Sequence, residues 1–154
     1  MRNKNLDKEK IFSKLDELDD YIEELEKIKP MDLDEYNGSI EKKRACERLL
    51  QISIENVIDI CNIIISGLKL GIPSDEDIIF DKLRDKKVIS MGMKNILIEM
   101  KGFRNILVHK YGKVDNERVF ENIGELDDFD KFKEEIIRFL KQYTEEKVGE
   151  KSRK

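Results

Sequence analysis

The side chains best suited to chemistry gather in one octapeptide, RNILVHKY, at residues 104–111. It contains Arg104, Asn105, Tyr111 and His109, the only histidine of the chain. Arginine stays cationic and can grip a phosphate with paired hydrogen bonds, whereas histidine exchanges protons near neutral pH. These two residue types could cleave RNA without a metal ion. His109 would accept the proton of a 2′-OH that attacks the adjacent phosphorus, and Arg104 would stabilise the charge on the phosphoryl oxygens.

Helix geometry complicates this interpretation of the octapeptide. Arg104 and His109 are five residues apart, so in a regular helix their Cβ directions diverge by roughly 140°. They converge on one phosphate only if the helix loosens near His109. In the alternative interpretation, His109 ends a helix, where its cation interacts favourably with the helix dipole, and Tyr111 packs as an ordinary aromatic residue. The residues alone favour this alternative.

A second set of polar residues follows one face of the long apolar helix expected over 39–69. Spacings of three and four residues align its members. Their side chains could contact the arginine and the histidine and orient them. The usual explanation of such a stripe, however, is a solvent-exposed helix face with ion pairs. The stripe consists of Arg48, Gln51, Glu55, Asp59 and Asn62.

The apolar residues recur at helical spacing over most of the chain. No segment has the pattern of a strand, and no internal repeat is present. We therefore expect an all-α fold, an antiparallel bundle of about five helices. A single domain should span residues 1–146, followed by a flexible tail over 147–154. The helices are expected over 11–28, 39–69, 75–86 with Ser74 as its cap, 90 to about 109, and 127–146, with short helical segments at 32–35 and 119–123.

Composition excludes several classes of protein. The net charge is −4, so nothing indicates a basic surface that coats nucleic acid, and any such contact must be local. The single histidine and two cysteines form no metal-binding cluster, and the sequence has no P-loop, GxGxxG or GxSxG motif. We therefore expect neither a metal nor another cofactor, and no nucleotide hydrolysis by the usual routes.

The cysteines and the lengths of the apolar runs indicate the cellular compartment of the protein. Cys46 and Cys61 lie 15 residues apart on one expected helix. This separates them by about 22 Å, too far for a disulfide, so we expect two buried apolar residues. No apolar run approaches the ~20 residues of a membrane span, and the N-terminus lacks a signal peptide. The expected location is the cytoplasm, with no membrane partner.

Three segments carry a resemblance to a known family. They are RACERLLQISIENVIDICNIII at 44–65, FDKLRDKKVIS at 80–90 and MKGFRNILVHKYGKVDNERVF at 100–120. The last contains the pattern Arg-x4-His-x-Tyr. In this order, over roughly residues 5–145, the segments resemble the HepT-like branch of the HEPN superfamily.

The resemblance implies a function and a set of site residues. HepT-like proteins are metal-independent ribonuclease toxins, paired with a minimal nucleotidyltransferase antitoxin that transfers AMP to the tyrosine of the motif, here Tyr111. The family dimerises, which brings two motifs together in a cleft. Groups from two chains can then complete one site, which in part resolves the divergence of Arg104 and His109 on one helix. The expected catalytic residues are Arg104, His109 and Asn105, which matches the polar residue that often follows the family's arginine. Supporting roles are expected for Glu47, Arg48 and Glu55.

Two further hypotheses remain beside a homodimeric ribonuclease toxin. In the first, the chain is a non-catalytic HEPN module that binds a nucleotide or docks a nucleotidyltransferase partner. In the second, it is a structural helical dimer in which Arg104 and His109 serve only packing.

Overall fold

The computed structural model describes residues 6–72, 75–109 and 114–152, with side chains up to residue 144. All regular elements in these residues are α-helices, as the sequence predicts. In chain order they are α1 (Lys8–Ile28), α2 (Leu33–Asn37), α3 (Ile40–Gly67), α4 (Glu76–Asp85), α5 (Met91–His109), α6 (Asn116–Ile123) and α7 (Asp127–Ser152).

Short polar side chains cap most of the helix starts. The Asp32 carboxylate accepts a hydrogen bond from the Glu35 amide at 2.8 Å, and the Ser39 hydroxyl accepts one from the Lys42 amide at 3.1 Å. Such caps satisfy backbone donors that have no partner inside the helix. The cap expected at Ser74 lies outside the described residues, and Asp75 caps α4.

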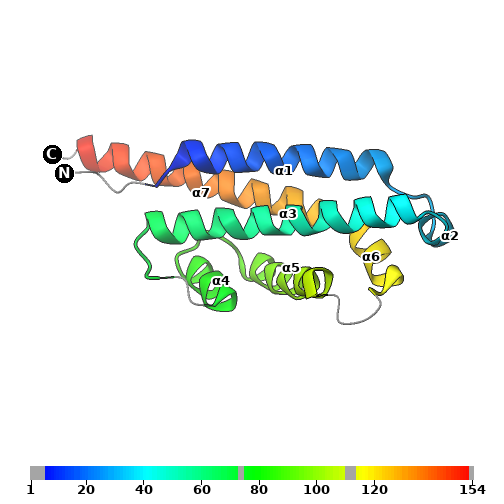
Figure 1. Ribbon diagram of the computed structural model, residues 1–154. Coiled ribbons are helices and arrows are strands. Elements are labelled where there is room, and N and C mark those ends of the chain that lie inside the picture. The colour runs from blue at the N-terminus through cyan, green and yellow to red at the C-terminus, as the bar shows by residue number, and fades with distance from the viewer. Residues whose placement is uncertain (1–5, 73–74, 110–113, 153–154) are drawn as a thin grey trace.

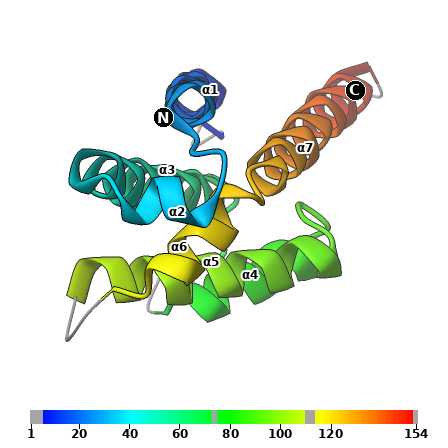
Figure 2. The same cartoon turned by 90° about the vertical axis from the view of Figure 1, so that its right-hand side faces the viewer.

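The central helix α3 separates two layers. Figure 1 shows α1 and α7 above it, with α1 antiparallel to both α3 and α7, and α4 and α5 below it. The lower pair is foreshortened in Figure 1 but extends lengthwise in Figure 2, so α4 and α5 run across the long helices. The predicted antiparallel arrangement therefore holds for α1 against α3 and α7, whereas α4 and α5 cross the long helices instead of running along them.

The core follows the apolar periodicity of the sequence. Helix α3 packs against α1, α2, α4, α5 and α6, which explains why its apolar residues point in several directions. Along α3 the buried residues at helical spacing include Leu50, Ile54, Val57, Ile58, Cys61 and Ile65, and Leu68 is half-buried. Contrary to our expectation, α3 is long and apolar enough to cross a membrane by length and composition, but 56% of the apolar window is buried inside the protein. The core helix of a folded domain meets the same criterion.

The expected boundaries need two corrections. The described residues form seven helices rather than about five, because the short segments around 32–35 and 119–123 are the complete helices α2 and α6, of 5 and 8 residues. The last helix continues to Ser152 instead of ending at 146. A flexible tail over 147–154 remains a prediction, as does the single domain over 1–146.

The buried cysteines yield a testable prediction. Cys46 and Cys61 are both free and buried, as expected. Burial raises the pKa of each thiol, so at pH 8 neither forms the thiolate that attacks a disulfide reagent. We expect no reaction of the native protein with Ellman's reagent at pH 8 and reaction of both thiols in guanidinium chloride. Rapid labelling of the native protein would contradict this packing of α3.

Candidate active site

Helix α5 carries three of the four predicted site residues, Arg104, Asn105 and His109. Tyr111 lies outside the described residues. The helix stays regular through His109, its last residue. The loosened turn that would let Arg104 and His109 converge within one chain is therefore absent up to that position, and the divergence of roughly 140° applies.

The Arg104 guanidinium is held by two neighbouring side chains. Its Nη2 donates to both carboxylate oxygens of Glu76, at 2.7 and 2.8 Å, and its Nε donates to Asn105 Oδ1 at 2.9 Å. The Arg104 side chain is 17% exposed and that of Glu76 is 29% exposed. Partial burial reduces the screening of this ion pair by solvent. The contact orients the Arg104 guanidinium toward the first turn of α4.

Two more ion pairs fix α4 along α5. Lys101 Nζ lies 2.6 Å from Asp77 Oδ1, and Lys94 pairs with Asp81. Residues later in α5 therefore pair with residues earlier in α4, so the two helices are antiparallel neighbours. This alignment brings Glu76 to Arg104. Glu76 could not be found from the sequence, because it lies 28 residues before Arg104 and no local spacing connects them.

His109 and Asn105 share a face of α5. They are four residues apart, and successive helical positions rotate by about 100°, so their Cβ directions differ by only about 40°. His109 is exposed in the last turn. Because the Asn105 carboxamide also accepts from Arg104, Asn105 connects the guanidinium to the face that carries His109. The catalytic role of Asn105 remains a prediction.

The same face of α5 is apolar and open at its middle. Ile106 is 38% exposed, and a Cβ added at Gly102 would meet nothing within 4 Å. Gly102, Ile106 and His109 lie within about 60° of one another around the helix axis. A second helix could therefore approach this face closely.

Two of the three residues expected to support the site, Glu47 and Glu55, contact other residues of α3. The buried Glu47 carboxylate accepts from Arg44 Nη1 at 3.0 Å. Burial and the Glu47 charge raise the pKa of Tyr36, in α2. The Glu55 carboxylate accepts from Gln51 Nε2 at 3.0 Å, and Arg48 is exposed. The supporting role of Glu47, Arg48 and Glu55 remains a prediction.

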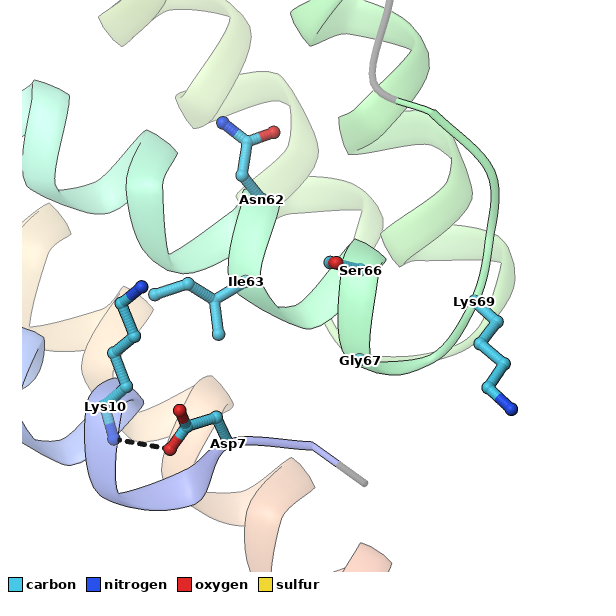
Figure 3. A pocket seen from close by; sticks show the side chains of 7 residues that line it. All are labelled: Asp7, Lys10, Asn62, Ile63, Ser66, Gly67 and Lys69. Carbon is cyan, nitrogen blue, oxygen red and sulfur yellow. Dashed lines mark hydrogen bonds between the residues drawn. The ribbon is translucent and has the colours of Figure 1, made fainter. Parts of the chain in front are cut away.

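The rest of the polar stripe lies against α1. Asp59 pairs with Lys14 at 3.4 Å, as an ion-paired helix face would. Asn62 lines a hollow of about 590 Å³ between the start of α1 and the end of α3, together with residues that include Lys10 and Ser66. Figure 3 shows these side chains around the hollow. None of the predicted catalytic residues lines it.

Comparisons with known proteins agree with the resemblance of the motifs. The family model described as Ribonuclease HepT-like matches residues 18–136. The tRNA nuclease HepT of Aphanizomenon flos-aquae is 32% identical over 114 residues, which cover 74% of this chain and 78% of the relative.

Solved structures share the fold. A tri-AMPylated HEPN toxin of Shewanella oneidensis, in complex with its MNT antitoxin, matches with a TM-score of 0.76 and 26% identity, over 83% of this chain and 96% of the toxin. The cytosolic protein YutE of Bacillus subtilis, of unknown function, matches with a TM-score of 0.77 and 23% identity, over 90% and 93% of the two chains. At that identity the second match concerns the fold alone. The family model and the nuclease relative establish that the chain belongs to the HepT-like ribonuclease family of HEPN proteins.

Proposed function

We propose that this protein is a metal-independent endoribonuclease toxin that acts in the cytoplasm as a homodimer and is neutralised by a minimal nucleotidyltransferase antitoxin. One observation carries the proposal. In a chain of this family, the arginine and the histidine of the motif lie on one helix, with the guanidinium already held by a carboxylate and a carboxamide. The similar nuclease is named for tRNA, which makes tRNA the first substrate to test.

The proposed reaction uses only groups of the protein and the RNA. His109 accepts the proton of a 2′-OH as this oxygen attacks the adjacent phosphorus. Arg104 stabilises the charge that builds on the phosphoryl oxygens, and Asn105 orients the phosphate or His109. The bond to the 5′-oxygen breaks, and that oxygen takes up a proton. The products are a 2′,3′-cyclic phosphate and a 5′-hydroxyl end.

A second copy of the chain completes the proposed site. Within one chain Arg104 is turned toward Glu76, whereas His109 lies on a diverging face of α5. In a two-fold dimer, the arginine of one chain and the histidine of the other can face one phosphate, as the family's paired motifs imply.

The experiment for this function is cleavage of tRNA by the purified protein in the presence of EDTA. We expect fragments with 2′,3′-cyclic phosphate ends, and growth arrest on expression in cells that the nucleotidyltransferase rescues. Cleavage only with an added divalent metal, or fragments with 5′-phosphate ends, would refute the mechanism. Harmless expression of a folded protein without nuclease activity would instead favour the non-catalytic module.

The proposed acceptor of AMP is Tyr111. A phosphodiester two residues beyond His109 adds negative charge and bulk where RNA must bind. After incubation with the nucleotidyltransferase and ATP, we expect the intact mass to rise by whole AMP units and the nuclease activity to fall. Tyr111→Phe should keep its mass and its activity. Tyr21→Phe, on α1, is the matched control and should still be modified; modification of Tyr111→Phe would show that the acceptor is elsewhere.

A further inference from the structure

We propose that Glu76 is a positioning residue that holds Arg104 in its reactive orientation. The inference rests on the proposed nuclease function and adds a residue from a second helix to the site. Glu76 is the first residue of α4, and its carboxylate bridges to Arg104 Nη2 through both oxygens. Because Glu76 acts through Arg104, it need not touch the RNA.

The hydrogen-bond donors of the Arg104 guanidinium fall into two groups, those that contact Asn105 or Glu76 and those that contact neither. Arginine carries five N–H donors. Asn105 accepts a hydrogen bond from Nε, and the Glu76 carboxylate accepts from Nη2. The donors of Nη1 have no partner within the described part of the chain. The anchored edge is therefore the one with Nε and Nη2, and Nη1 is available for a phosphoryl oxygen.

The carboxylate of Glu76 is itself firmly placed. Helix α4 buries Ile79, Phe80 and Leu83 in the core. One turn of α4 is tied to α5 by the pair of Asp77 with Lys101, and the next turn by the pair of Asp81 with Lys94. A support on a packed helix orients its partner more precisely than a support on a loop.

Holding the guanidinium in advance favours the chemical step. A free arginine side chain loses much rotational freedom when it binds a phosphate, and a pre-formed contact removes part of this loss. The opposite arrangement is a latch, in which the carboxylate competes with the phosphate for the guanidinium. The available Nη1 favours positioning, because a phosphate can bind there without displacing Glu76.

Glu76→Gln distinguishes these arrangements, since it keeps the shape of the side chain and removes its charge. We expect kcat for a tRNA substrate to fall by about 10-fold to 100-fold, the cost of a misplaced catalytic group. KM should stay the same or fall, because the loss of a negative charge does not weaken the attraction of RNA. The latch predicts the reverse, a higher kcat.

Asp77→Asn is the matched control for charge and location. It removes the adjacent carboxylate of the same helical turn and breaks the ion pair with Lys101, but it leaves Arg104 and Glu76 in contact. We expect its kcat to match that of the unmodified protein. An equal loss in both variants would mean that the packing of α4, not the orientation of Arg104, controls the rate.

A double variant and a spectroscopic readout separate positioning from a general structural role. In the Arg104→Ala background, Glu76→Gln should cause no further loss of kcat, whereas independent effects would multiply. In ¹⁵N spectra, the Nη2 protons of Arg104, which contact Glu76, should exchange faster with water in Glu76→Gln than in Asp77→Asn. An unchanged exchange rate, or an undiminished kcat in Glu76→Gln, overturns the inference. A folded unmodified protein that leaves RNA intact refutes the nuclease function itself.

Discussion

His109→Ala is expected to lower kcat/KM for RNA by about 10²-fold to 10⁴-fold, the contribution of a general acid or base. The chain has one histidine, so no second imidazole can replace it. His109 is exposed at the end of α5, and its truncation opens no cavity in the core. Toxicity should disappear, while the melting temperature and the molecular mass measured by light scattering should not change.

Val108→Ala is the matched control for this loss. It truncates the preceding side chain, which is 45% exposed, in the same turn of α5 but on a different face. We expect this variant to cleave RNA like the unmodified protein. A His109→Ala protein that is folded and fully active would end the assignment of His109 as the proton acceptor.

Two inactive chains are expected to regain activity when they are combined in one dimer. Arg104→Ala removes the group proposed to stabilise charge in the transition state, which should lower kcat by about 10²-fold to 10³-fold. A heterodimer of Arg104→Ala and His109→Ala chains has one composite site with both side chains intact and one site with neither. With two-fold symmetry, the purified heterodimer should have about half the activity of the unmodified dimer.

This complementation tests the composite site independently of the family's properties. Chains with two different affinity tags, expressed together, allow the heterodimer to be purified away from both homodimers. If Arg104 and His109 acted within one chain, each heterodimer would contain two damaged sites and stay as inactive as the homodimers. Gel filtration of all three species controls for loss of the dimer.

The helices and the core could be predicted from the sequence because their determinants are local. The spacing of apolar residues predicted the buried face of α1 and most of that of α3, and the starts of α2 and α3 lie close to the expected ones, beside the short polar residues Asp32 and Ser39. The lengths of α2 and α6 were underestimated, since a short helix depends more on its packing than on its own sequence. The number of helices was wrong for this reason.

By itself, the sequence determined the all-α class, the core and the residues of α5 that belong to the candidate site. Only the tertiary structure decided that α4 and α5 cross the long helices and that Glu76 binds Arg104. The ion pair joins residues 28 positions apart, and it depends on the antiparallel alignment of two helices, which core packing and the pairs of Lys94 and Lys101 fix. Helical periodicity specifies which face of a helix is buried, but not which partner helix covers it or at what angle.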